Sequence, residues 1–161
     1  FPEAVFVILG EGDYEKELKK LTKECGVEDK VFFLGFQKNP FKFFKNAKIF
    51  LFPTLYEGFP NVLVEAMACG LPVIATDCPG ANKEILAPNF KEKIEKVYLG
   101  EYGVLIPTRN PEEIERAVSI LLENENLRKE YSQKAKLRAK DFSVEKILPQ
   151  WLEVLKWEIE V

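Results

Sequence analysis

The chain has 161 residues, of which 47% are hydrophobic and 30% charged, and its formal net charge is -3. This is the composition of one ordinary globular domain, and no apolar run approaches the ~18–20 residues that cross a membrane. The acidic balance argues against a broadly basic nucleic-acid-binding surface. Because the sequence has no histidine, Ser-His-Asp catalysis, Cys-His catalysis and histidine-ligated metal are excluded within it.

The first third of the chain alternates between predicted strands and helices. The apolar run at 4–9 is typical of a strand buried on both faces. A glycine-containing turn follows, and apolar residues at helical spacing then predict a helix from Tyr14 to Cys25. Further strands are predicted at 31–34 and 48–52, with a short helix at 40–46 between them.

The rest of the chain continues this alternation. The predicted elements are a helix at 61–69, a strand at 72–76, a short helix at 83–86, a strand at 103–106, and helices that begin at Asn110, near Asn126 and at Ser143. Asn110, Pro111 and Glu113 have the residue types preferred at the N-cap, first and third positions of a helix. Residues 88–100 are charged and irregular, which indicates an excursion, and Pro149 should kink the last helix.

Strands that alternate with helices predict an α/β fold with a Rossmann-like parallel sheet and helices on both faces. The cysteines are three in number and lack C-x-x-C spacing, so we expect buried free thiols in a reducing cytoplasm, not a disulfide or zinc site. Because the first residue is Phe1 and no signal peptide precedes the first strand, we expect a piece of a longer protein.

The start of the helix at 61–69 has the features of an anion-binding site. Gly58-Phe59-Pro60-Asn61 turns from a strand into this helix, and Gly58 permits a close backbone approach or a positive φ. Free N–H groups near Val62 and Leu63 would face the carboxyl edge of the sheet, where ligands of open α/β sheets bind. Together with the helix dipole, these groups suit a diphosphate.

Two glutamates flank this helix start. Glu57 and Glu65 would repel a diphosphate, so they make sense only if they face hydroxyl groups, and a carboxylate accepts hydrogen bonds from two adjacent hydroxyls. Glu65 lies one turn into the helix and could reach a ribose, whereas Glu57 lies nearer a distal sugar. The alternatives are a solvent-facing helix residue for Glu65 and a plain loop acid for Glu57.

Gly10 and Gly12 follow the first strand in the manner of a phosphate loop. The third glycine of a G-x-G-x-x-G loop would fall at Glu15 and is absent. A tight turn is therefore the simpler interpretation of the residues alone.

The segment EGFPNVLVEAMACGLPVIA, from Glu57 to Ala75, resembles the E-x7-E signature of the retaining GT-B glycosyltransferases, family four of the usual classification. Flanking segments agree in order and spacing: ILGEGD at 8–13, VFFLGF at 31–36, AKIFLFPTLYEGFP at 47–60 and YGVLIPTRNPEEI at 102–114. The resemblance covers most of residues 3–125. It implies that residues 1–161 are a single nucleotide-sugar-binding domain, the C-terminal half of a GT-B fold, with 143–161 as the helix that crosses back to the acceptor domain.

The resemblance also implies roles for individual residues. Glu57 would be the catalytic-site residue that contacts the transferred sugar, and Glu65 would bind the ribose hydroxyls of the donor. The other implied substrate-binding residues are Gly58, Phe59, Pro60, Asn61, Val62 and Leu63 around the sugar and diphosphate, Phe36 and Gln37 near the base, and Gly10 and Gly12 along the cleft. The donor would be a UDP- or GDP-sugar, with no metal ion and no other cofactor.

The function implied is retaining sugar transfer in bacterial or archaeal surface-glycan or lipid-linked glycan synthesis. The partner would be an N-terminal acceptor domain of the same protein, not a nucleic acid, and the location would be the cytoplasm or the inner face of the membrane. In this family a further strand precedes the position of Phe1 and lies between the strands at 4–9 and 48–52. The sheet of residues 1–161 would then lack its middle strand, so we expect either that the native chain starts upstream of Phe1 or that the strands rearrange. We also expect Trp151 and Trp157 to form an exposed apolar patch.

The alternative is a non-catalytic Rossmann-like module that binds a nucleotide, such as a dinucleotide, or a protein. An epimerase of GT-B architecture also uses paired acids, but the motifs that would favour it are not present. Titration with UDP- and GDP-sugars against NAD separates the first two hypotheses.

Overall fold

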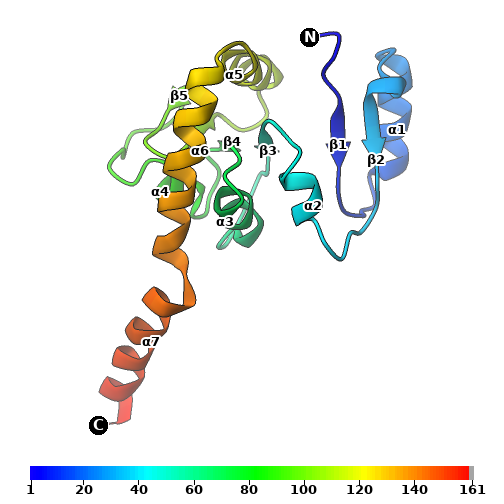
Figure 1. Ribbon diagram of the computed structural model, residues 1–161. Helices are drawn as coiled ribbons and strands as arrows, with labels where there is room; N and C mark the ends of the chain where they lie inside the picture. The colour runs from blue at the N-terminus through cyan, green and yellow to red at the C-terminus, as the bar shows by residue number, and fades with distance from the viewer. Residues whose placement is uncertain (160–161) are drawn as a thin grey trace. The chain divides into compact units, whose positions relative to one another are not determined.

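The computed structural model describes the backbone of residues 1–159 and the side chains of residues 1–155. The chain divides into two compact units, residues 1–42 (unit 1) and 43–161 (unit 2). A short helix, α2 (Phe41–Phe44), lies at the boundary in the sequence. Each unit is described by itself, and Figure 1 labels their elements.

Unit 1 is a single β-α-β motif. Strand β1 (Phe6–Ile8) leads through α1 (Glu15–Glu24) and the one-turn 3-10 helix η1 (Glu28–Lys30) to β2 (Val31–Phe33). The two strands pair in parallel, with Val7 opposite Phe32, and Figure 1 shows α1 alongside β2. β1, α1 and β2 were predicted from the sequence within one or two residues at each end, whereas η1 was not predicted.

The prediction that the first strand is buried on both faces was wrong. Phe6 and Val7 are exposed, and no described side chain of unit 1 is buried. The reason is that the sheet of β1 contains β2 alone among the described strands, so β1 has one neighbour where a central strand has two. β1 and β3 belong to different sheets.

Unit 2 is built on a four-stranded sheet of order β3-β4-β6-β5. Three strands are parallel, namely β3 (Phe50–Phe52), β4 (Val73–Thr76) and β6 (Val104–Ile106). The edge strand β5 (Tyr98–Leu99) runs antiparallel to β6. The helices of this unit are α3 (Asn61–Ala68), α4 (Asn82–Leu86), α5 (Pro111–Glu123), α6 (Glu125–Ala139), the one-turn η2 (Lys140–Phe142) and α7 (Val144–Ile159).

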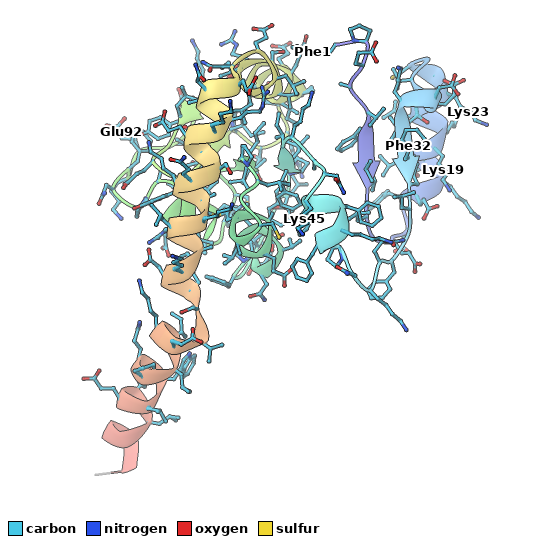
Figure 2. All side chains as sticks on the ribbon, in the orientation of Figure 1. Phe1, Lys19, Lys23, Phe32, Lys45 and Glu92 are labelled. Atoms are coloured by element: carbon cyan, nitrogen blue, oxygen red, sulfur yellow. The ribbon has the colours of Figure 1, made fainter. Side chains whose placement is uncertain are left out.

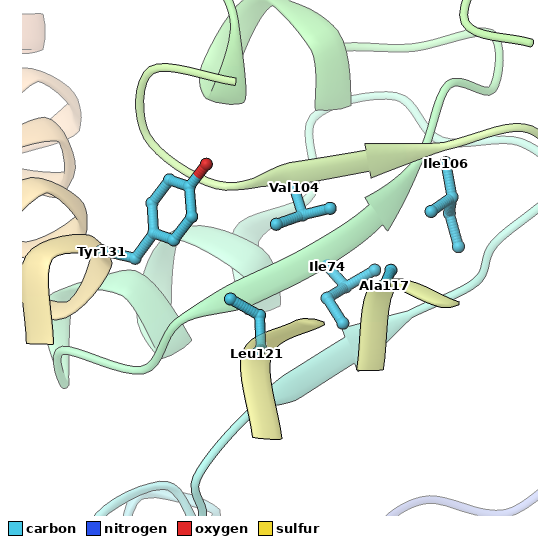
Figure 3. Close-up of a cluster of buried hydrophobic side chains, with 6 residues drawn as sticks. All are labelled: Ile74, Val104, Ile106, Ala117, Leu121 and Tyr131. Carbon is cyan, nitrogen blue, oxygen red and sulfur yellow. The ribbon is translucent and has the colours of Figure 1, made fainter. Parts of the chain in front are cut away.

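The core of unit 2 lies on both faces of this sheet. On one face Ile74, Val104 and Ile106 pack against Ala117 and Leu121 of α5 and Tyr131 of α6, as Figure 3 shows. Burial raises the pKa of Tyr131 to about 12, and its hydroxyl donates to the Gly100 carbonyl oxygen at 3.0 Å.

On the other face of the sheet, α4 approaches β4 closely. A Cβ atom placed on Gly103 would lie 2.7 Å from Val73 Cγ2 and 3.0 Å from Leu86 Cδ2, so glycine is required for this packing. Because successive side chains of a strand point to opposite faces of the sheet, Val73 of β4 lies on the face opposite to Ile74. Helices therefore cover both faces, and the predicted Rossmann-like α/β fold is confirmed.

Two further expectations need correction. The excursion at 88–100 contains strand β5 and is partly packed, since Ile94 is buried and the rings of Phe90 and Tyr98 stack at 4.1 Å. All three cysteines are free, as predicted, but only Cys78 is buried, and Cys25 is exposed. The unpacked surface of unit 1 explains the exposure of Cys25.

Helix α7 leaves the sheet and carries an exposed apolar face. Figure 1 shows it projecting away from the other elements of unit 2, and it continues as a helix through Pro149. The Trp151 side chain is 62% exposed, as expected, and Leu148 and Leu155 are exposed beside it. The Trp157 side chain lies outside the described residues. No helix among the described residues is long and apolar enough to cross a membrane.

Candidate functional site

Helix α3 and the loop before it place the two candidate carboxylates. Leu63, Ala66 and Met67 form the buried face of α3, which leaves Glu65 on its exposed face, one turn into the helix. Glu57 is half-buried in the loop that follows β3. This loop stands at the carboxyl end of a parallel strand, the edge at which open α/β sheets bind ligands.

The first turn of α3 is not capped by a side chain. Asn61 donates its amide N–H to the Phe59 carbonyl oxygen at 3.0 Å, and Leu63 and Val64 both donate to the Pro60 carbonyl oxygen. Leu63 was expected to have a free amide, so that detail was wrong: the buried Pro60 accepts its bond in a tight first turn. Among the described residues, the Val62 amide has no hydrogen-bond partner and carries the positive end of the helix dipole.

A second loop holds the loop of Glu57 in place. The Glu57 amide donates to the Pro79 carbonyl oxygen at 3.0 Å, and the Ala81 amide donates to the Gly58 carbonyl oxygen at 3.2 Å. We call residues 77–81, which follow β4, the bracing loop. Sequence reasoning did not identify it as part of the site, although it directly follows the strand predicted at 72–76.

The aromatic ring of Phe59 is held from another direction. It lies 5.4 Å from the ring of Phe142, in the 3-10 turn η2 between α6 and α7. The Arg138 guanidinium lies 4.8 Å from the same Phe142 ring and donates to the carbonyl oxygens of Glu84 and Ile85. The start of α7 is therefore connected to the candidate site through packed side chains.

The candidate residues of unit 1 lie together at the carboxyl ends of β1 and β2. The Gly10 amide donates to the Gly35 carbonyl oxygen at 2.9 Å, and the Gln37 side chain donates to the Leu34 carbonyl oxygen at 2.7 Å. The Phe36 amide lies 3.4 Å from Glu11 Oε1. The structure thus places Gly10, Gly12, Phe36 and Gln37 on adjacent loops. It also adds Glu11, which sequence reasoning passed over although it stands between the two glycines.

Two hollows in the described surface are lined by none of the predicted site residues. One, of about 350 Å³, lies in unit 1 between α1 and β2, where Figure 2 labels Lys19, Lys23 and Phe32. The other, of about 330 Å³, lies in unit 2 beside Asp77 and Thr108, which follow β4 and β6. The Asp77 carboxylate already has two partners, because it pairs with Lys83 at 2.8 Å and accepts from the Ile94 amide at 3.0 Å.

The arrangement in unit 2 can bind an anion flanked by hydroxyl groups. Residues 57–65 supply all three groups. They are the Glu57 carboxylate before α3, the open Val62 amide in its first turn and the Glu65 carboxylate one turn into the helix. Within the described part of the chain, no three His, Cys, Asp or Glu side chains are grouped so that they could hold a metal ion.

Comparison with known proteins identifies relatives over nearly the whole chain. The family model described as Glycosyl transferases group 1 matches residues 1–138. An uncharacterized glycosyltransferase of Methanocaldococcus jannaschii is 40% identical over 94% of this chain and 41% of its own length. The N-acetylgalactosamine-N,N'-diacetylbacillosaminyl-diphospho-undecaprenol 4-alpha-N-acetylgalactosaminyltransferase of Campylobacter jejuni is 38% identical over 92% of this chain and 38% of its own length.

A solved structure also resembles nearly the whole chain. HepE of Anabaena, in complex with UDP, superimposes with a TM-score of 0.83 and 26% identity over 97% of this chain and 42% of its own. The chain therefore spans about two fifths of the length of these relatives.

Proposed function

The chain belongs to the glycosyl transferases group 1 family, and from this membership we propose that it is the donor-binding part of a retaining glycosyltransferase that uses a nucleotide-diphospho-sugar. The observation that carries the proposal is the position of Glu57 and Glu65 on either side of the start of α3, at the carboxyl edge of the sheet. The acceptor would be bound by a further domain of the same protein, because this chain spans about two fifths of its relatives.

The donor would lie with its diphosphate at the start of α3. The open Val62 amide and the dipole of α3 would stabilise negative charge on the diphosphate. Glu65 would accept hydrogen bonds from the two ribose hydroxyls, and Glu57 would do the same for hydroxyls of the transferred sugar. The roles that the resemblance implies for Phe36, Gln37, Gly10 and Gly12 of unit 1 stay predictions.

Catalysis would rest chiefly on stabilisation of the departing diphosphate. Retention of configuration requires the leaving and attacking groups to share one face of the sugar. No described residue is an evident covalent nucleophile poised by a base, so the reaction would pass through an oxocarbenium-like state on that face. Glu57 would stabilise the positive charge that develops at the anomeric carbon, and the start of α3 would stabilise the leaving oxygen. The reaction would need no metal ion.

The choice of donor and acceptor follows from what the relatives are named for. HepE was solved with UDP, which favours a uridine donor over a guanosine one. The Campylobacter relative transfers N-acetylgalactosamine to an undecaprenyl-diphosphate-linked sugar. We therefore propose UDP-N-acetylhexosamine as the first donor class to test and a lipid-linked glycan as the acceptor class, used in the cytoplasm or at the inner face of the membrane.

The test is UDP binding by calorimetry with Glu65→Gln. Loss of the carboxylate charge should weaken binding by ~1–3 kcal/mol, because a charge-assisted contact to the ribose becomes a neutral one. Glu115→Gln, on the exposed surface of α5, is the matched control and should bind UDP like the wild type. Unchanged affinity in Glu65→Gln would remove Glu65 from the ribose, and binding of NAD in preference to UDP would favour a dinucleotide-binding module.

A further inference from the structure

Gly80 presses against the backbone of Glu57. A Cβ atom placed on Gly80 would lie 2.8 Å from the carbonyl carbon of Glu57 and 3.0 Å from its Cβ, and closer still to its carbonyl oxygen. The φ angle of Gly80 is +134°, a conformation that residues with a side chain rarely adopt. Because the obstructing atoms include backbone, a larger residue at position 80 could be accommodated only if one of the two loops moved.

The hydrogen bonds of the bracing loop lie on both sides of this contact. Pro79, immediately before Gly80, accepts from the Glu57 amide, and Ala81, immediately after it, donates to the Gly58 carbonyl oxygen. The peptide group before Glu57 and the peptide group after Gly58 are therefore tied to the peptide groups on both sides of Gly80. This arrangement fixes the backbone from which the Glu57 carboxylate projects.

A buried amide fastens the bracing loop to the sheet. The Asn82 side chain is fully buried, and its Nδ2 donates to the Thr76 carbonyl oxygen at 3.0 Å and lies 3.4 Å from Cys78 Sγ. Its Oδ1 is buried and has no hydrogen-bond partner among the described residues. A buried polar atom without a partner is unfavourable, so the clamp on Thr76 and Cys78 is made at some cost to stability.

We propose that Gly80 is a positioning residue for Glu57. Its bare α-carbon lets the bracing loop, anchored by Asn82, fix the direction of the Glu57 carboxylate toward the transferred sugar. The inference rests on the proposed function, in which Glu57 contacts that sugar. Small displacements of a group that acts on a reacting centre reduce rates strongly. Among the described residues, no backbone hydrogen bond joins the bracing loop to Glu65 or to the first turn of α3, so nucleotide binding there should be affected less.

The first experiment tests, without any substrate, whether the bracing loop holds the backbone of Glu57 in place. Amide hydrogen exchange is followed at Glu57 and Ala81 in the full-length protein and in Gly80→Ala. Gly70→Ala is the matched control, because Gly70 also has a positive φ of +80° and a crowded α-carbon, but its neighbours are the side chains of Ser132 and Lys136. Exchange at Glu57 should become at least ~10-fold faster in Gly80→Ala only. Equal exchange rates at Glu57 in the two variants would show that Gly80 does not hold the backbone of Glu57 in place.

The second experiment tests whether the brace acts through Glu57. Transfer of the sugar to water, which releases UDP, is measured in the full-length protein with UDP-N-acetylgalactosamine, UDP-N-acetylglucosamine and UDP-glucose, and kcat is taken with the best donor. Gly80→Ala should lower kcat by ~10–100-fold, while the Kd for UDP stays within about twofold. In the Glu57→Gln background the same substitution should change kcat by less than about threefold, because the group being positioned is already lost.

Other outcomes have definite meanings. An equal loss of kcat from Gly80→Ala in both backgrounds, or a parallel loss of UDP affinity, would overturn the positioning role. Absence of UDP release and of UDP binding by the wild type would count against the proposed function. The exchange experiment would still show whether Gly80 and the bracing loop hold the backbone of Glu57 in place. If Gly80→Ala does not fold, Ala81→Pro removes only the bond to Gly58, since the φ of Ala81 is −88°, near the proline range. It should also raise exchange at Glu57.

Discussion

Units 1 and 2 contain the same kinds of elements but differ completely in burial. In unit 2 the central strand β4 has a partner on each side and is buried along its whole length. In unit 1 the strand β1 has one partner, and α1 has no buried residue although its apolar residues recur at helical spacing. Local sequence pattern therefore determines which element forms, whereas burial depends on whether the neighbouring elements are there to cover it.

The sharpest way to test this difference is to remove one leucine from each unit. Leu121 is fully buried in the core of unit 2, and Leu121→Ala should lower the free energy of unfolding by ~2–5 kcal/mol, because a cavity remains. Leu18 of α1 is 41% exposed, and Leu18→Ala should cost less than ~1 kcal/mol. Urea denaturation of the two variants and the wild type gives both values. Similar losses would mean that unit 1 is as well packed as unit 2.

Much of the fold could be predicted because its signals are local. The apolar run at 72–76 and the Asn110-Pro111 helix start were each found within a residue or two of β4 and α5. β5 was missed because it has two residues and is defined by its pairing with β6, which no local pattern encodes. The exposure of β1 was missed for the same reason, since it depends on a neighbour.

The candidate site shows the same limit. Glu57 and Glu65 could be singled out because a helix start and a strand end within one segment predict their surroundings. The contact of Gly80 with Glu57 could not be predicted, since the two residues lie in separate loops that meet only when β3 and β4 pair. Glu11 was passed over because its bond to the Phe36 amide joins the ends of two strands.

A smaller effect should distinguish the helix starts of the two units. The Asn110 side chain caps α5 by accepting from the Glu113 amide at 3.1 Å, whereas Tyr14 before α1 makes no such bond. Asn110→Ala should therefore lower the free energy of unfolding by ~1 kcal/mol. Tyr14→Ala, the control, should leave the exchange rates of the first α1 amides unchanged. A loss below ~0.3 kcal/mol in Asn110→Ala would show that tertiary packing alone fixes α5.

The smallest effect expected is a pH dependence of stability that arises from Asp141 in unit 2. A hydrogen bond from Lys146, at 2.5 Å, and a second from Arg138, at 3.1 Å, hold the pKa of Asp141 below its ordinary value of 3.8. The unfolded state then binds the proton more readily, so Asp141 stabilises the fold fully above that ordinary value. This stability is lost as the pH falls through the lower pKa of the folded state.

Asp141→Asn should remove this part of the acid dependence. Because the Asp141 side chain is 39% exposed, solvent screening limits the loss at neutral pH to less than ~1 kcal/mol. Free energies of unfolding measured between about pH 2 and 7 should converge for wild type and variant at the acid end, where the carboxyl is protonated in both states of the wild type. Glu15→Gln, which removes the exposed Glu15–Lys19 pair of unit 1, is the control and should cost ~0.5 kcal/mol or less. Parallel wild-type and Asp141→Asn profiles over the whole range would show that the pairs of Asp141 with Lys146 and Arg138 add nothing to the stability of unit 2.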